Sequence, residues 1–248
     1  MNDQSAWNLC GTTAQLTTEF LDATIDVERL DLGLGSLTSR INGHNVKFDT
    51  LRILGVGAGR VDPAAVKSTD YYERGDDMIV SCRLTKTPDV GLQVYWRVIH
   101  DETTRVTGIE AIVSAQTELL DSHPASTVSS LLPAGDILTI TAGRDQAFQP
   151  LVLDSGGSAT GDGAVLIRFK SDEISFLEMV HPSDDRGVTI KRTSGRLVTS
   201  YPVLTERLEK GVIRRSRLRA MFLPRENDSS LALDLYAQFA SSPPPLTT

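Results

Sequence analysis

The sequence has few residues that would cross-link it, hold a metal or anchor it in a membrane. Its two cysteines, Cys10 and Cys82, form no Cys-x-x-Cys pair, and its four histidines show no zinc-ligand spacing. No metal and no cofactor are therefore expected. Apolar runs stay well short of the roughly 20 residues of a membrane helix, and residues 1–5 lack the basic segment of a secretory signal. These absences predict a reduced, cytoplasmic protein with no membrane partner.

Lysine is scarce as well. Of the 25 basic residues 19 are Arg and 6 are Lys, and 32 acidic residues bring the formal net charge to -7. A domain that follows a nucleic-acid backbone is usually strongly basic, so no nucleic-acid partner is expected. The length of 248 residues is enough to bury a substantial core.

The patterning of the chain predicts strands. Thr occurs 24 times, and short β-branched segments are separated by Gly, Pro, Asn or Asp. Residues 36–41 and 44–48 flank Asn42-Gly43, which favours the positive φ values of a two-residue hairpin turn. The other strand candidates are residues 78–84, 92–99, 108–119, 137–141, 164–169, 174–180, 188–191, 197–203 and 212–223.

These candidates recur at a spacing of about 10–15 residues with almost no helical periodicity between them. That pattern argues against alternating βαβ units and favours an antiparallel sandwich or barrel. We therefore expect an all-β protein, a large antiparallel β-sandwich in a single domain over residues 1–248, with short terminal helices. The Gly- and Ser-rich stretch 154–163 is interpreted as a long loop within that domain.

Helical signals are found mainly at the two ends of the chain. Over about residues 229–240, apolar residues recur every four positions, and Asp228 or Ser229 is available as the N-cap. The Pro-rich tail 241–248 then stops the helix and is expected to be extended.

Two short motifs suggest chemistry but do not complete their patterns. Residues 55–60 (GVGAGR) resemble a dinucleotide-binding loop, but Arg ends the motif where a third Gly is needed. Residues 154–157 (DSGG) are similar to the nucleophile segment of trypsin-like serine proteases, but Leu and Ser replace the flanking Gly and Pro. Loops are the better interpretation of both. A hydrolase that uses Ser155 or the acids near His181 therefore ranks third among the functions considered.

The strongest charge pattern lies in residues 212–222 (VIRRSRLRAMF). On a strand, Arg215, Arg217 and Arg219 share one face and apolar residues share the other. Three guanidinium groups in a row repel one another unless carboxylates or a bound anion compensate their charge. They are candidates for binding a sugar acid or sugar phosphate, and the alternative is a solvated face with salt bridges. The acids considered for those salt bridges are Glu206, Glu209 and Glu178.

Glu178 and His181 are the candidate catalytic residues, because a carboxylate and an imidazole at a strand end can serve as acid and base. On a continuous strand the two side chains point to opposite faces, so they can cooperate only if the chain bends at His181. Pro182 follows directly and makes such a bend feasible. The alternative is a hydrogen-bonded turn.

Aromatic and arginine side chains occur together in two further segments. One set is Tyr71, Tyr72 and Arg74, and the other is Tyr95, Trp96 and Arg97. Aromatic faces stack on the C–H faces of sugars while guanidinium groups bond to hydroxyls, so Tyr72, Arg74 and Arg97 are candidate ligand-binding residues. Trp96 shares a face with three apolar residues and is expected in the core.

Residues 35–44 (GSLTSRINGH) resemble the first hairpin of aldose 1-epimerase (galactose mutarotase)-like β-supersandwich proteins. The long antiparallel strands and the late Arg-rich strand are similar too, over about residues 25–225. The resemblance implies a carbohydrate-binding groove across a concave sheet, often with a histidine acid and a glutamate base at the anomeric centre. The family's usual catalytic segment, an Asn-His pair followed by aromatic residues, is missing from this sequence.

These observations leave two main functions open. In the first, the protein binds or acts on a sugar or sugar acid in a groove on one sheet, as a carbohydrate-binding protein, a mutarotase-like epimerase or another carbohydrate-active enzyme. Its partner is then a saccharide or a small anionic ligand. In the second, it is a non-enzymatic β-sandwich module that contacts other proteins through its carboxyl-terminal helix and Pro-rich tail. The oligomeric state is left open by the sequence.

Overall fold

The chain is built almost entirely of antiparallel strands. The computed structural model describes residues 5–41, 44–58, 66–84, 89–101, 104, 106–141, 146–170 and 173–244. In these ranges the first strands are β1 (Trp7–Cys10), β2 (Thr13–Thr17), β3 (Leu21–Asp26), β4 (Gly35–Ile41), β5 (His44–Phe48), β6 (Arg52–Ala58), β7 (Val66–Arg74), β8 (Asp77–Leu84) and β9 (Val90–Asp101). The later strands are β10 (Val106–Thr117), β11 (Ser126–Pro133), β12 (Gly135–Ile140), β13 (Phe148–Pro150), β14 (Ser158–Phe169), β15 (Ile174–Val180), β16 (Val188–Thr193), β17 (Arg196–Val203) and β18 (Arg214–Pro224). The helical elements there are α1 (Asp228–Ser241) and the short 3-10 turns η1 (Leu30–Leu32) and η3 (Pro182–Asp184).

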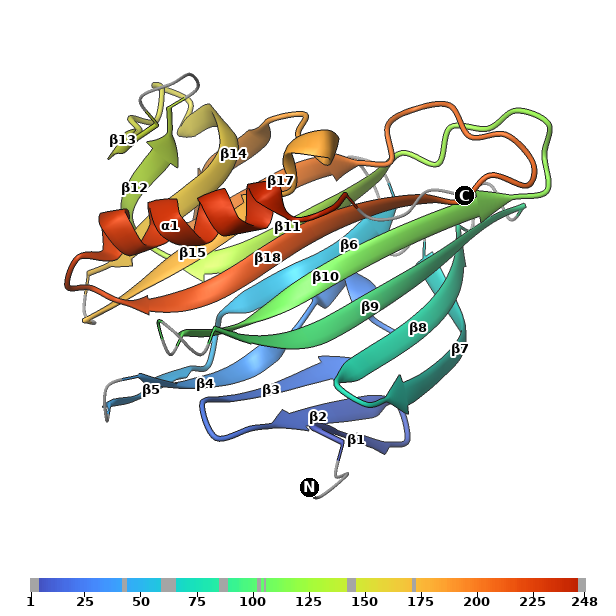
Figure 1. Cartoon of the computed structure of the whole chain (residues 1–248), viewed down its shortest axis with the longest axis horizontal. Helices are drawn as coiled ribbons and strands as arrows, with labels where there is room; N and C mark the ends of the chain where they lie inside the picture. The colour runs from blue at the N-terminus through green and yellow to red at the C-terminus, as the bar shows by residue number, and fades with distance from the viewer. Residues whose placement is uncertain are drawn as a thin grey trace.

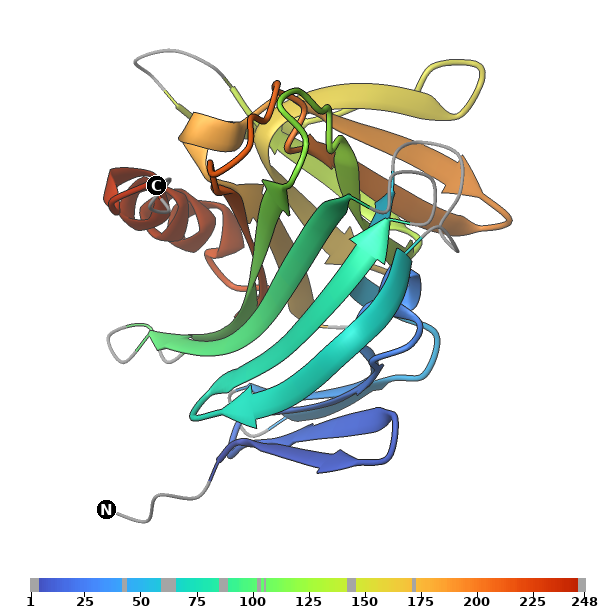
Figure 2. The same ribbon diagram turned by 90° about the vertical axis from the view of Figure 1, so that its right-hand side faces the viewer.

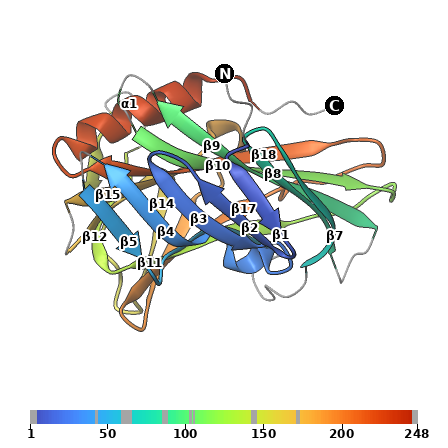
Figure 3. The same cartoon turned by 90° about the horizontal axis from the view of Figure 1, so that it is seen from below.

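Within that part of the chain, the strands form two antiparallel sheets. The small sheet has the order β1-β2-β3-β4-β5. The large sheet runs β6-β11-β17-β16-β14-β15-β18-β10-β9-β8-β7, with β12 paired to β14 and β13 paired to β12. The small sheet lies below the large one, and α1 lies across the front of β18 (Figures 1 and 3). The expected all-β class, an antiparallel sandwich with a short terminal helix, is confirmed.

A hydrophobic core fills the space between the two sheets. Leu16 and Ile25 enter it from the small sheet, and Trp96 and Phe222 enter it from the large one; all four are fully buried. The indole Nε1 of Trp96 donates to the carbonyl oxygen of Leu54 at 3.2 Å, which satisfies its polar atom inside the core. Trp96 is therefore a core residue, as its strand face predicts.

The helix α1 covers the opposite face of the large sheet. A second hydrophobic cluster joins Leu177 of β15 and Met221 of β18 to Leu235 and Phe239 of α1. Every residue of β15 is buried, because one face of the strand contacts the core and the other contacts the helix. The far end of the β9–β10 hairpin bends toward the side on which α1 lies (Figure 2).

A buried ion pair ties the start of α1 to the sheet. Arg168 of β14 donates to the Asp228 carboxylate through Nη2 at 2.6 Å and Nε at 2.9 Å, and Ser175 of β15 donates to it at 2.6 Å. Asp228 is only 2% exposed. Burial alone would raise the pKa of this carboxyl group, but the hydrogen bonds from Arg168 and Ser175 lower it below its usual range.

Most strand predictions agree with the structure. The hairpin predicted from residues 36–41 and 44–48 is present as β4 and β5, with Ile41 opposite His44, while its Asn42-Gly43 turn lies outside the described residues. The helix expected at about 229–240 extends over Asp228–Ser241. Of the Pro-rich tail, residues 245–248 lie outside the described ranges.

Two local expectations were wrong, and of the terminal helices expected only the carboxyl-terminal one is present in the described ranges. Near the amino terminus, β1 and β2 form a hairpin whose alternate side chains reach the core. The stretch 154–163 is not all loop, since from Ser158 onward it pairs with β16. The N-cap of α1 is Asn227, at φ 57° and without a side-chain cap, because Asp228 is turned toward Arg168.

No helix in the described ranges is long and apolar enough to span a bilayer.

We predict that Asp228→Ala lowers the free energy of unfolding by about 3 kcal/mol, because it leaves a partly buried guanidinium group without its carboxylate. Urea denaturation followed by circular dichroism measures this change. Asp121→Ala is the matched control: Asp121 pairs with Arg207 at 2.8 Å on the surface, so its loss is expected to cost less than about 1 kcal/mol. Equal effects of the two substitutions would contradict an anchoring role for Asp228.

Candidate functional site

All six predicted ligand-binding residues lie on one face of five neighbouring strands. We call this the outer face: the side of β7, β8, β9, β10 and β18 that points away from the core between the sheets. Residues directly opposite one another in antiparallel strands point to the same face. The register places three rows of residues on this face. They are Arg74, Asp77, Arg97, Glu110, Arg219; then Tyr72, Ile79, Tyr95, Ile112, Arg217; then Asp70, Ser81, Gln93, Ser114, Arg215.

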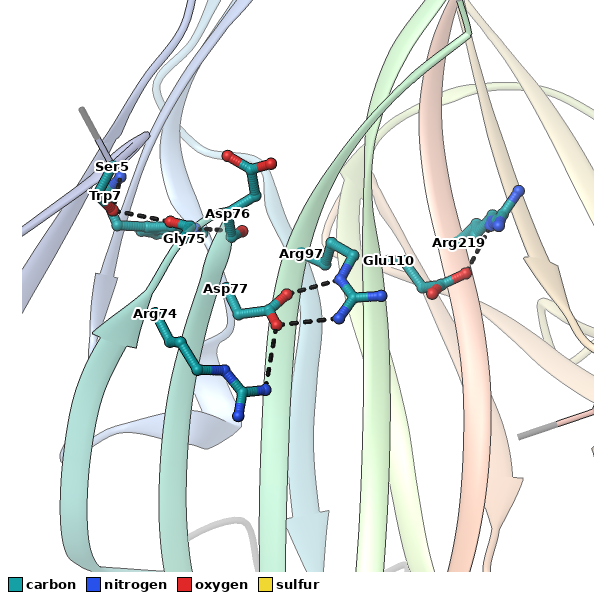
Figure 4. A network of polar contacts seen from close by, with 9 residues as sticks. All are labelled: Ser5, Trp7, Arg74, Gly75, Asp76, Asp77, Arg97, Glu110 and Arg219. Carbon is teal, nitrogen blue, oxygen red and sulfur yellow. Dashed lines mark hydrogen bonds and ion pairs between the residues drawn. The ribbon is translucent and has the colours of Figure 1, made fainter. Parts of the chain in front are cut away.

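The first row alternates in charge from strand to strand (Figure 4). Arg97 donates to both carboxylate oxygens of Asp77 at 2.7 and 2.9 Å, and Arg74 approaches the same carboxylate at 3.6 Å. Arg219 Nε donates to Glu110 at 2.7 Å. Both carboxylates are buried and the arginines are more exposed, so the row is largely ion-paired. The hydrogen bond to Asp77 raises the pKa of Arg97.

Of the acids considered for salt bridges to the arginine-rich strand, Glu206 pairs with Arg214, but Arg219 pairs with an acid that was not considered. Arg219 pairs with Glu110, whereas Glu206 pairs with Arg186 and Arg214, and Glu209 lies near Arg207 at 3.8 Å. Sequence patterning does not identify Glu110, because its proximity to Arg219 depends on the register between β10 and β18.

The carboxyl end of α1 covers part of the outer face. The Phe239 ring lies 5.1 Å from the guanidinium carbon of Arg217 and 4.5 Å from that of Arg219. Such cation–π contacts offset the repulsion between neighbouring guanidinium groups. Arg217 also donates to the hydroxyl of Ser242, the C-cap of α1. Arg217 and Arg219 are therefore held by the protein's own helix.

The third row borders a hollow of about 250 Å³, which we call the outer-face hollow. Among the side chains that line it are Thr69, Ser81, Gln93, Ser114, Gln116 and Arg215. Gln93 is held in place because its Nε2 donates to Ser81 at 3.2 Å and its Oε1 accepts from the Tyr95 hydroxyl. Hydroxyl and amide groups around a concavity are suited to a ligand that carries hydroxyl groups. Sequence analysis missed Gln93 and Ser114, because neither belongs to a motif.

Glu178 does not reach the outer face. Its side chain points into the core, where Ser130 and Thr199 each donate to one of its carboxyl oxygens at 2.5 Å. The group is fully buried. Burial raises the pKa of Glu178 from 4.5 to about 7, although both hydrogen bonds act in the opposite direction.

His181 lies on the opposite side of β15 from Glu178. The chain stays extended at His181, with φ -64° and ψ 137°, and its N–H still donates to Arg217 on β18 at 3.0 Å. Its Nε2 lies 3.1 Å from the Ser242 carbonyl oxygen, and its ring meets Phe239 edge-on at 5.4 Å. The bend that cooperation would need is absent, so the structure does not bring the predicted acid and base together.

A larger hollow, about 660 Å³, lies away from these residues, beside β12 and residues 150–157. It includes Ser155, but none of its lining residues among those described is a histidine. Asp154 accepts hydrogen bonds from the backbone N–H groups of Gly156 and Ser158, which is a turn-stabilising role. The arrangement gives no support to a serine hydrolase.

Over the same described ranges, no group of three or more His, Cys, Asp or Glu residues is arranged to hold a metal ion.

Comparisons with known proteins identify the fold. No protein-family model and no curated protein sequence matches the chain. The galactose mutarotase related enzyme from Lactobacillus acidophilus matches with a TM-score of 0.53 and 7% identity, over 84% of this chain and 96% of that one. The GalM/aldose epimerase homologue from C. elegans matches with a TM-score of 0.51 and 10% identity, over 84% and 97%.

A TPR-domain containing protein from Parabacteroides distasonis also matches, with a TM-score of 0.52 and 12% identity over 86% of this chain. The match covers 46% of that chain, so the present chain spans less than half of it. At these identities the likeness concerns the fold alone. The chain has a galactose mutarotase-like β-sandwich fold, as the hairpin at residues 35–44 suggested.

We predict that Glu178→Gln makes stability less dependent on pH. The folded protein keeps the Glu178 proton up to about pH 7, whereas the unfolded chain releases it near pH 4.5. The free energy of unfolding therefore falls as the pH rises through that window, by up to about 3 kcal/mol, and the neutral amide removes this fall. Denaturant titrations at several pH values measure it. Glu209→Gln, at an exposed position, should keep the wild-type slope, and the same slope in Glu178→Gln would refute the prediction.

Proposed function

We propose that the protein binds a saccharide, or another small ligand rich in hydroxyl groups and negative charge, on the outer face of β7, β8, β9, β10 and β18. The observation that carries this proposal is the gathering on that face of Tyr72, Arg74, Arg97, Arg215, Arg217 and Arg219, from three separate parts of the sequence. The galactose mutarotase-like fold supports a carbohydrate-related role.

The middle row supplies an apolar platform. Tyr72 and Tyr95 flank Ile79, which is fully buried although it points to the outer face. Tyr72 remains 39% exposed, so its ring is available for stacking on the C–H face of a sugar. Hydrogen-bonding groups border this platform on both sides: Arg97 in the first row and Gln93 in the third. This combination of an apolar floor and polar edges is what saccharide recognition requires.

We further propose that the protein binds its ligand without catalysing epimerisation. Proton transfer at an anomeric centre needs an acid and a base within hydrogen-bond reach of the same sugar. Glu178 lies in the core and His181 lies beneath the end of α1, so the pair cannot contact one ligand. The role proposed here for the outer face is recognition.

The alternative, a protein-interaction module that docks through α1, has less support. Such a helix would need its apolar side available to a partner. Ala232, Leu235 and Phe239 are instead buried against the large sheet. The cytoplasmic location expected from the sequence stays a prediction.

We expect a glycan array to identify at least one bound saccharide, and isothermal titration calorimetry to give its affinity. Tyr72→Ala and Gln93→Ala should each weaken that affinity about tenfold, because each removes a stacking or hydrogen-bonding group worth about 1.4 kcal/mol. Gln149→Ala, on the exposed part of β13, is the matched control and should bind like the wild type. Absence of any saccharide binding, or binding that both substitutions leave unchanged, would argue against the proposal.

A further inference from the structure

A third hollow, of about 190 Å³, lies at the beginning of β18 and is rich in arginine. We call it the arginine hollow. Its charged lining residues are Arg186, Arg214, Arg215, Asp184 and Glu206. Arg215 lines the outer-face hollow as well, so the two hollows share one guanidinium-bearing side chain. A ligand in one hollow is therefore adjacent to the other.

The lining of the arginine hollow carries more basic than acidic side chains. One carboxylate, that of Glu206, accepts hydrogen bonds from both Arg186 and Arg214 at 2.5 Å each. Asp184 is the other acid of the lining, and its carboxylate accepts from the Ser183 hydroxyl at 3.2 Å. Three guanidinium groups thus face two carboxyl groups, and burial raises the pKa of Asp184, which further disfavours its negative charge.

Two arginines of β18 have a buried Nε atom without a hydrogen-bond partner among the described residues. One of them, Arg214, lines the arginine hollow, whereas the other, Arg217, lies against Phe239. Buried donors in folded proteins are almost always paired, so an unmet donor indicates a missing partner such as an anion or a water molecule. Arg217 also bonds to Ser242, and Pro244, two residues further on, lines the arginine hollow.

We propose that the arginine hollow binds the anionic substituent of a ligand whose uncharged ring occupies the outer-face hollow. The ligand class is then acidic saccharides, in which the charge is a carboxylate, a phosphate or a sulfate. This inference rests on the proposed function of the outer face. Guanidinium groups match these anions because their planar fork donates two parallel hydrogen bonds to two oxygens.

The test compares one sugar ring with and without charge. Isothermal titration calorimetry is carried out with D-galactose, D-galacturonate, D-galactose 6-phosphate and D-galactose 6-sulfate, and with inorganic sulfate alone. At least one charged sugar should bind about tenfold or more tightly than galactose, the usual gain from a charge-assisted bidentate contact. The three charged probes distinguish a carboxylate site from a phosphate or sulfate site.

Substitutions then locate the charge preference. Arg214→Gln and Arg186→Gln, which alter the arginine hollow and not the outer face, should each reduce the affinity for the preferred charged sugar toward that of galactose, with galactose binding retained. Arg214→Lys keeps the charge but lacks Nε and the planar fork, so it should also lose most of the preference. Arg192→Gln, an exposed arginine beside the larger hollow, is the matched control and should behave as the wild type. Melting temperatures establish that each variant is folded.

The outcomes separate this inference from the proposed function. Equal binding of galactose and the charged sugars overturns the inference and leaves saccharide binding intact. A charge preference that survives in both glutamine variants also overturns it, because the anion is then bound elsewhere. Sulfate binding without any sugar binding overturns it as well, since the hollow is then a site for free anions. Failure of every sugar and of sulfate removes the proposed function and this inference together.

Discussion

On a strand of the large sheet, each side chain points either into the core or onto the outer face. These two environments differ in dielectric constant. On β18, Leu218 and Phe222 enter the core while Arg217 and Arg219 face outward. The same alternation along β15 and into His181, the residue that follows it, places the Glu178 carboxyl group and the His181 ring on opposite sides of the sheet. The arrangement of charge in the protein follows from this division.

Charged side chains on the outer face are stabilised by neighbouring groups of opposite charge and by an aromatic ring. Buried carboxylates of Asp77 and Glu110 pair with Arg97 and Arg219, and the Phe239 ring contacts the guanidinium groups of Arg217 and Arg219. A guanidinium group in the core would instead require several kcal/mol of desolvation. The third row brings hydroxyl and amide groups to the outer-face hollow beside Arg215, and these groups are the reason for placing the proposed ligand at the Arg215 end of the face.

Local patterns predicted β15, which is rich in apolar residues, β18, which alternates, and the hairpin of β4 and β5. They missed β11, whose serines interrupt the apolar run; one of them, Ser130, donates to the buried Glu178 carboxyl group. The candidate ligand residues were recognised by residue type alone. Their assembly was not predictable, because Tyr72, Arg97 and Arg215 come to share one face only through the register of four strand pairs.

The sequence by itself determined the all-β class, the carboxyl-terminal helix and the alternation that puts Arg215, Arg217 and Arg219 on one face. These features depend on interactions between residues close in the chain, which periodicity reports directly. Only the tertiary structure decided which acids pair with the arginines, that α1 covers two of these arginines, and that Glu178 is enclosed in the core. Those outcomes depend on contacts between distant segments, such as Arg219 with Glu110, and no local pattern encodes them.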